Sequence, residues 1–122
     1  MAKKVLVVDD SRTALMMERE ILEKATPYHC VTASNGREAV EKAKQERPDL
    51  ILMDVVMPRM NGFEACKLIR QEQITRNIPI VLVTTRGEEE YMEAGFQSGC
   101  SDYIIKPVNG EELVALLQSY LG

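Results

Sequence analysis

Four short apolar runs in this 122-residue sequence are each followed directly by side chains that could do chemistry. Carboxylates follow two of the runs, and the other two lead into hydroxyls and an ammonium. Carboxylates held close together repel one another, so such a cluster persists only where a cation or protons offset the charge. The side chains, in chain order, are Asp9 and Asp10, Asp54, Thr84 and Thr85, and Lys106.

The types of these side chains indicate what the cluster would bind. No histidine or cysteine stands near them in the sequence to favour zinc, whereas carboxylate oxygens suit Mg²⁺, which usually also takes waters and a phosphate. Lys106 would supply a second positive charge for phosphate oxygens, and Thr84 one hydrogen bond. The residues therefore predict a site for a phosphoryl group between Mg²⁺ and Lys106, with a carboxylate available as nucleophile.

The apolar runs themselves predict the strands that would position this site. They are unbroken stretches of β-branched residues and leucine, which is typical of parallel strands buried on both faces. A weaker fifth strand is expected at residues 29–32, and its polar start places it at an edge of the sheet. The four stronger runs are residues 5–8, 50–53, 80–83 and 103–105.

Between the strands, apolar residues recur at helical spacing. Asn35 with Glu38, and Asn109 with Glu112, have the spacing of a capping box and predict where two helices begin. These stripes would face the sheet and leave the charged residues between them in solvent. The expected apolar stripes are Ala14, Met17, Ile21 and Ala25; Ala39, Val40 and Ala43; Ala65, Cys66 and Ile69; and Leu113, Leu116, Leu117 and Tyr120.

A further helix is expected at residues 88–98, although Gly95 weakens it. Its three glutamates, residues 88–90, predict a solvated helix start, and Gly99 predicts its C-cap. Strands and helices then alternate five times, which predicts a parallel α/β sheet with helices on both faces and right-handed crossovers. Residues 1–122 would form one domain, with ligands bound outside the carboxyl ends of the strands.

Composition narrows the possible partners and location. The chain has 19 acidic and 15 basic residues and a formal charge of -4, so it is a poor nonspecific binder of nucleic acid. No apolar run approaches the roughly 20 residues needed to cross a bilayer, and residues 5–8 are too short for a signal peptide. Three separated cysteines form neither a disulfide framework nor a metal cluster, so a reducing cytoplasm is the expected location.

Four separated segments, in the same order along the chain, resemble the hallmarks of the receiver domain of two-component response regulators. The resemblance extends from Lys4 to Leu121, and in size the chain is CheY-like. It implies a flavodoxin-like, doubly wound fold with a five-stranded parallel sheet in the strand order 2-1-3-4-5. The segments are VVDDS at residues 7–11, DVVMPRMNG at 54–62, VT at 83–84 and DYIIKP at 102–107.

The resemblance assigns metal and phosphoryl roles to residues of the cluster. It implies that Asp54 is the phosphoacceptor and, with Asp10, a direct ligand of Mg²⁺. Asp9 would help to bind the ion through water, and the backbone carbonyl of Val56 would complete the protein ligands. The implied function is that of a signalling switch and not of an enzyme, because the domain would promote only its own phosphorylation and dephosphorylation.

The resemblance also implies how the switch would work. Lys106 would pair with the phosphoryl group, and its bond to Pro107 would be cis. Thr84 would move to hydrogen-bond a phosphoryl oxygen, and Tyr103 would turn inward behind it. The donor would be a phosphohistidine on a histidine kinase or phosphotransfer protein, and a downstream protein would bind the face formed by the fourth helix, fifth strand and fifth helix. The expected setting is a monomer or weak dimer in chemotaxis or motility, with no direct contact to nucleic acid and no insertion into a membrane.

The chain departs from the commonest family pattern near the expected site. Val56 stands two residues after the phosphoacceptor, where a polar residue is often found, and Thr85 stands where a smaller alanine is frequent. Arg86, and Val108 in place of a common phenylalanine, are further departures. Because Val56 cannot orient an attacking water and Thr85 narrows access, we expect a longer-lived phosphoryl group than in relatives with small polar residues there.

Other functions remain open on the sequence alone. A phosphatase with an aspartyl-phosphate intermediate would need a separate acid–base group and a cap insertion, for which the loops are short. A phosphorylation-independent receiver-fold interaction module is the main alternative, and retention of the site residues argues against it. A nucleotide or flavin binder would need a glycine-rich loop after the first strand. Asp9 and Asp10 could also be simple helix caps, an interpretation that weakens once Asp54 and Lys106 are considered with them.

Overall fold

The computed structural model describes residues 2–85 and 92–122, along which strands and helices alternate. The predicted helix start at residues 88–90 and the departure at Arg86 lie outside the described residues. The strands are β1 (Lys4–Val8), β2 (His29–Ala33), β3 (Leu50–Asp54), β4 (Ile80–Thr85) and β5 (Asp102–Lys106). The helices are α1 (Arg12–Ala25), α2 (Gly36–Glu46), α3 (Gly62–Gln71), α4 (Met92–Ser98) and α5 (Gly110–Leu121). No helix in these two ranges has the length and apolar character needed to cross a membrane.

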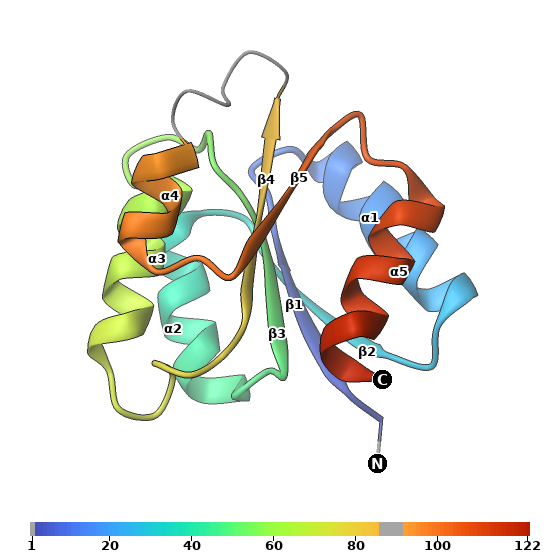
Figure 1. The fold of residues 1–122 in the computed structure, drawn as a ribbon, viewed down its shortest axis with the longest axis horizontal. Helices are drawn as coiled ribbons and strands as arrows, with labels where there is room; N and C mark the ends of the chain where they lie inside the picture. The colour runs from blue at the N-terminus through green and yellow to red at the C-terminus, as the bar shows by residue number, and fades with distance from the viewer. Residues whose placement is uncertain (1, 86–91) are drawn as a thin grey trace.

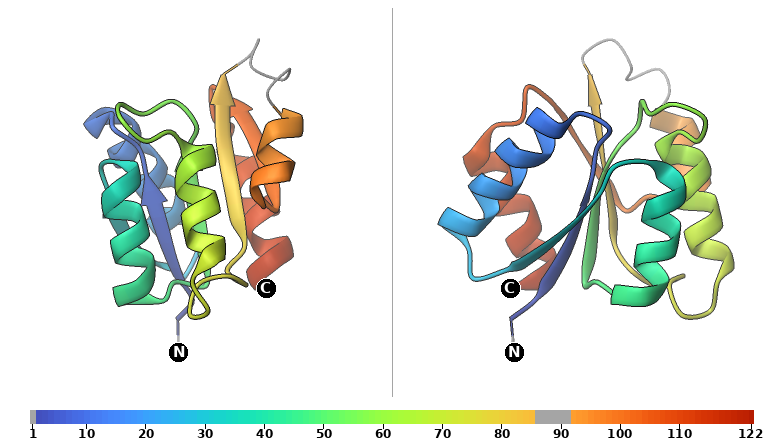
Figure 2. Two further views of the ribbon diagram at one scale, coloured as in Figure 1. Left: turned by 90° about the vertical axis from the view of Figure 1, so that its left-hand side faces the viewer. Right: turned by 180° about the vertical axis from the view of Figure 1, so that it is seen from behind.

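Within these ranges all strands run parallel in one sheet, in the order β2-β1-β3-β4-β5, so the predicted α/β fold and strand order are confirmed. β2 lies at one edge, as its polar start indicated. Helices α1 and α5 cover one face of the sheet, and α2, α3 and α4 cover the other (Figure 1). Figure 2 shows the same two helical layers from the side and from behind. The carboxyl ends of the parallel strands therefore meet at one edge of the sheet.

The sheet separates two apolar cores, which explains the unbroken apolar runs. Leu6 and Val8 of β1 belong to the core beneath α2 and α3, whereas Val5 and Val7 belong to the core beneath α1 and α5. All four are at most 2% exposed. Because both faces of the central strands are covered, an alternation of apolar and polar residues would bury unpaired polar groups on one face.

Side chains cap the N-termini of α1, α2, α3 and α5. Asn35 and Asn109 each accept a hydrogen bond from the backbone N–H of the third residue onward, as predicted, and Ser11 caps α1 in the same way. A capping box with both reciprocal hydrogen bonds forms between Asn61 and Glu64 at the start of α3. The sequence indicated only a turn at this position, and the cap fixes the direction in which the chain leaves β3.

Gly99 ends α4 with a φ of 102°, the left-handed region in which glycine is favoured, as the C-cap prediction requires. Its carbonyl accepts a hydrogen bond of 2.9 Å from Arg70 Nε, and Arg70 Nη1 donates to the carbonyl of Ile78 at 2.7 Å. Arg70 on α3 thereby holds both the segment that precedes β4 and the turn that precedes β5.

The buried face of α1 differs from the predicted stripe. Met17 is 59% exposed and Ala25 is also exposed, whereas Glu18 is only 5% exposed and Leu22 is fully buried. The inward face instead follows Leu15, Glu18 and Leu22, at steps of three and four residues. The predicted stripe was wrong at Met17 and Ala25, because hydrophobicity alone assigned the methionine to the core and the acid to solvent, but Ile21 packs against the core as predicted.

Candidate functional site

The three predicted carboxylates converge at the carboxyl edge of the sheet. Asp9 follows β1 and Asp54 ends β3, and the register of these neighbouring strands pairs Val8 with Met53. One carboxylate oxygen from each of Asp9, Asp10 and Asp54 lies within 4.8 Å of the other two. Asp9 and Asp54 are buried, whereas Asp10 is exposed. The edge thus carries a compact set of oxygen donors of the kind that Mg²⁺ prefers.

Lys106 brings the opposing charge from the last strand of the sheet. Its Nζ lies 3.2 Å from Asp54 Oδ1 and 3.3 Å from Asp9 Oδ2, so one ammonium pairs with two buried carboxylates. Burial lowers the pKa of Lys106, but the charges of Asp54 and Asp9 outweigh that effect and raise the pKa above its ordinary value. Lys106 is therefore charged at neutral pH. The peptide bond between Lys106 and Pro107 is cis.

The surroundings of Asp54 raise its pKa from 3.8 to about 6. Burial is the largest cause, and the charges of Asp9 and, more weakly, Asp10 act in the same direction. The charge and hydrogen bond of Lys106 oppose them. At neutral pH most of the Asp54 population is still ionised, so it retains the charge that a metal ligand or a nucleophile needs.

Thr84 presents a buried hydroxyl at the end of β4. The residue is 1% exposed, and its Oγ1 has no hydrogen-bond partner in the part of the chain that the structure describes. Thr84 pairs with Ile105 of β5, one position before Lys106. Burying an unpaired hydroxyl is unfavourable by roughly 1–3 kcal/mol, so the site holds a donor that a ligand oxygen could satisfy.

The loop from β3 to α3 closes tightly over Asp54. A Cβ atom on Gly62 would lie 2.6 Å from the backbone oxygen of Asp54, and the Gly62 N–H donates to the carbonyl of Val55 at 2.8 Å. Glycine allows this close approach because it has no side chain. Val56 lies at the rim of the loop and is 59% exposed. The sequence indicated a turn here, but the close backbone approach to Asp54 became visible only in the structure.

Tyr103, the expected aromatic switch, is half-buried on β5. It pairs with Leu82 of β4 and packs against the core beneath α2 and α3. Its ring meets that of Phe96 edge to face, with ring centroids 6.3 Å apart and the planes at 79°. Phe96 lies on α4 and is 52% exposed. The two aromatic rings therefore link β5 to α4 at the surface expected to bind a downstream protein.

Glu18 is a residue near the site that the sequence interpretation missed. It is nearly buried, and within the described ranges its Oε2 has no hydrogen-bond partner. Burial raises the pKa of Glu18 from 4.5 to about 7; the charge of Asp9 adds to this, Lys106 opposes it, and Asp54 adds more weakly. Its spacing of four residues from the buried Leu22 was the signal that could have identified it.

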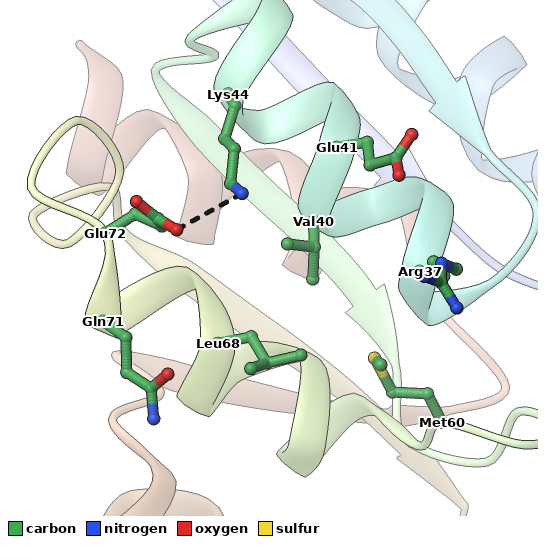
Figure 3. Close-up of a pocket in the computed structure, with 8 residues that line it drawn as sticks. All are labelled: Arg37, Val40, Glu41, Lys44, Met60, Leu68, Gln71 and Glu72. Carbon is green, nitrogen blue, oxygen red and sulfur yellow. Dashed lines mark ion pairs between the residues drawn. The ribbon is translucent and has the colours of Figure 1, made fainter.

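Two hollows lie on the α2 side of the molecule. One of about 600 Å³ opens beside Asp10, between the start of α2 and the loop from β3 to α3. Another, of about 330 Å³, lies between α2 and α3, where Val40 and Leu68 face each other and Lys44 pairs with Glu72 at 3.3 Å (Figure 3). Asp9, Asp10 and Asp54 do not line this second groove.

The parallel fold and its acid–lysine edge define a signalling domain of the two-component class. Residues 5–118 match the sequence profile of the response regulator receiver domain, and the chain belongs to this family. Phosphorylation-dependent switching is the general role of the family, and its members are signalling switches rather than conventional enzymes. Receiver domains interact with histidine kinases or phosphotransfer proteins and with downstream targets, and they bind Mg²⁺ at an acidic pocket. The predicted family and its switching role are therefore confirmed.

Individual relatives differ in length and setting. The chain is 39% identical over 121 residues to the alkaline phosphatase synthesis transcriptional regulatory protein PhoP of Bacillus subtilis. The aligned region covers 99% of this chain and 49% of PhoP, so the chain spans about half the length of that relative. The chemotaxis response regulator CheY4 of Vibrio cholerae has a TM-score of 0.91 and 38% identity, covering 98% of this chain and 99% of that one. The receiver domain of the sensor histidine kinase PA1611 from Pseudomonas aeruginosa, with a magnesium ion coordinated in its active site cleft, has a TM-score of 0.91 and 30% identity, covering 100% and 99%.

Proposed function

We propose that this chain is a Mg²⁺-dependent phosphoacceptor switch in which Asp54 receives a phosphoryl group from a phosphohistidine on a kinase or phosphotransfer protein. The observation that carries the proposal is the 3.2 Å pairing of Asp54 with Lys106 inside a cluster of carboxylates. A buried carboxylate beside an ammonium combines a nucleophilic oxygen with a charge that can stabilise phosphoryl oxygens.

The donor set at the sheet edge fits Mg²⁺. The three clustered groups offer only carboxylate oxygens, which suit a hard cation. Asp10, Asp54 and the backbone carbonyl of Val56 would hold the ion, and Asp9 would assist through water. When bound, Mg²⁺ supplies positive charge that offsets the carboxylates and the phosphoryl oxygens.

The side chains of the site then divide the work of phosphoryl transfer. An ionised oxygen of Asp54 attacks phosphorus while the bond from phosphorus to the donor's imidazole nitrogen breaks, and the electron pair of that bond stays on the imidazole. The product is an acyl phosphate on Asp54. The ammonium of Lys106 pairs with phosphoryl oxygens, and the buried Thr84 hydroxyl donates a hydrogen bond to one of them. Beyond this, the chain promotes only loss of its own phosphoryl group.

The phosphoryl group favours a second conformation through these contacts, because a ligand shifts an equilibrium only by its different affinity for the two states. As Thr84 moves toward the phosphoryl group, Tyr103 turns inward behind it and its contact with Phe96 changes. The altered surface is the face of α4, β5 and α5, to which a downstream protein binds. Direct contact with nucleic acid forms no part of this mechanism.

The setting that we propose is the cytoplasm, where the chain acts as a monomer or weak dimer. The structure gives Cys30, Cys66 and Cys100 as free and buried thiols, which suits a reducing compartment. Similarity to the chemotaxis response regulator CheY4 makes chemotaxis or motility the pathway to test first.

The proposal is tested by comparing Asp54→Asn with the matched control Asp49→Asn. Asp49 lies just before β3, at its opposite end, where its Oδ2 accepts a hydrogen bond from Lys4 N at 2.8 Å. With radiolabelled acetyl phosphate and Mg²⁺, the parent and Asp49→Asn should gain a base-labile label, and Asp54→Asn should gain none. Chelation of Mg²⁺ should abolish labelling of the parent. Full labelling of Asp54→Asn would refute the assignment.

A further inference from the structure

One buried acid has no part in the reaction described above. Glu18 lies on the inward face of α1, is 5% exposed, and has an oxygen without a hydrogen-bond partner among the residues described. A carboxyl group in an apolar layer is unfavourable unless it is paired. Packing alone does not require an acid here, because Leu22 fills the next turn of the same face with hydrocarbon.

A cation bound to the carboxylate cluster would disfavour the present position of Lys106. Its ammonium pairs with Asp9 Oδ2 and Asp54 Oδ1, which belong to the same carboxylates that form the oxygen donor set. A divalent cation held by these carboxylates would repel the nearby ammonium, because like charges repel strongly where water is largely excluded. The long, flexible side chain of lysine allows the ammonium to move instead.

A hollow of about 200 Å³ lies beside Lys106, and Glu18 lines it as well. An ammonium that entered an apolar hollow without an acceptor would lose its hydration and gain nothing in return. Glu18 is the lining residue that supplies a carboxylate, and the charge of Lys106 already lowers its pKa against the effect of burial. The remaining lining residues are Ala14, Met17, Ile21, Pro107 and Val108.

We propose that Glu18 is a second carboxylate partner for the Lys106 ammonium, used while a cation occupies the carboxylate cluster. This inference rests on the proposed Mg²⁺ site. Glu18 stabilises the metal-loaded, unphosphorylated state by pairing with the displaced lysine, and Lys106 returns to the centre when phosphoryl oxygens arrive. Glu18 is therefore a positioning residue, which acts on the reaction through Lys106.

The inference is tested by measuring Mg²⁺ affinity calorimetrically at about pH 8, above the pKa of Glu18. Glu18→Gln and Glu18→Leu should weaken binding about fivefold or more, a typical size for energetic coupling between two sites. Glu20→Gln removes the same charge from the exposed side of α1, where Glu20 pairs with Lys24, and should change the affinity far less. In a Lys106→Gln background, the effect of Glu18→Gln should shrink to the level of the Glu20→Gln control.

A second readout follows the lysine itself. In Mg²⁺-loaded parent protein, the Lys106 ammonium hydrogens should exchange slowly with water by NMR, and in Glu18→Leu they should exchange fast. If Glu18→Gln weakens Mg²⁺ binding equally in the parent and in the Lys106→Gln background, Glu18 acts only as a fixed charge. If Glu18→Gln binds Mg²⁺ as tightly as the parent, Glu18 does not act at all. Each result overturns the inference. A parent that binds Mg²⁺ normally in either case leaves the proposed function intact, whereas a parent that binds no Mg²⁺ refutes both.

Discussion

Lys106 Nζ lies 3.2 Å from Asp54 Oδ1, and this contact joins the edge strand β5 to the central strand β3 across the end of β4. The register explains its reach: Asp54 pairs with Val83, whereas Lys106 pairs with Thr85, two residues farther along β4. The lysine side chain therefore reaches back past the end of β4 to the carboxylate. In this state the ammonium offsets part of the charge of the cluster, which a bound cation would otherwise do.

Protonation of Asp54 should control the site at mildly acidic pH. Its raised pKa of about 6 means that, without metal, the carboxylate becomes neutral below that pH. We expect Mg²⁺ affinity to fall about tenfold for each unit of pH below 6, because a proton must then be displaced from Asp54. The carboxyl carbon of Asp54, followed by NMR in chelator, reports this pKa directly. Lys106→Met should raise it further, since Lys106 opposes the increase; a midpoint near 3.8 would contradict the prediction.

Glu18 should make the stability of the metal-free protein depend on pH. Its pKa is about 7 in the folded chain, against an ordinary value of 4.5 without burial, so the folded state holds the proton longer. Ionisation between these values therefore destabilises the fold, and the loss grows as pH rises. Glu18→Gln cannot ionise, so its free energy of unfolding should exceed that of the parent at pH 8 by on the order of 2–3 kcal/mol, and by much less at about pH 5.

Urea unfolding in chelator, at both pH values, measures this difference. Glu20→Gln, on the exposed side of the same helix, serves as the control and should show no comparable change between the two pH values. A constant difference between Glu18→Gln and the parent at both pH values would mean that packing, and not ionisation, sets the effect.

The fold and most of the cluster could be predicted because they depend on local features of the sequence. Strands buried on both faces need unbroken apolar runs, and parallel strands bring whatever follows each run to one edge, as they do for Asp9, Asp54 and Lys106. The same reasoning missed Glu18, because an average over hydrophobicity treats an acid as a surface residue even when helical spacing directs it inward. Nor could it show the function of Gly62, which depends on how closely a later loop returns to the backbone of Asp54.

Gly62→Ala should disturb the site through the backbone of Asp54. An added Cβ would lie 2.6 Å from the backbone oxygen of Asp54, so the loop or the strand end must move. We expect a loss of roughly 1–3 kcal/mol in the free energy of unfolding, as for other overpacked positions, and weaker Mg²⁺ binding because Asp54 shifts. Gly110→Ala is the matched control, since its Cβ would meet Ile21 at an ordinary 3.6 Å and glycine is unfavourable in a helix. That variant should be as stable as the parent or slightly more stable, and a harmless Gly62→Ala would contradict the argument.

Val56 should lengthen the life of the phosphoryl group on Asp54. Its side chain is apolar and 59% exposed at the rim of the loop that follows Asp54, so it offers no hydrogen bond to an attacking water. Val56→Asn adds an amide that can orient such a water, and the label should then be lost several-fold faster after the phosphodonor is removed. Val56→Ala removes bulk without adding a polar group, which separates orientation of water from steric access. Loss from the parent that is as fast as from Val56→Asn would contradict the prediction, and equally fast loss from both variants would assign the protection to the bulk of valine, because only the asparagine can orient water.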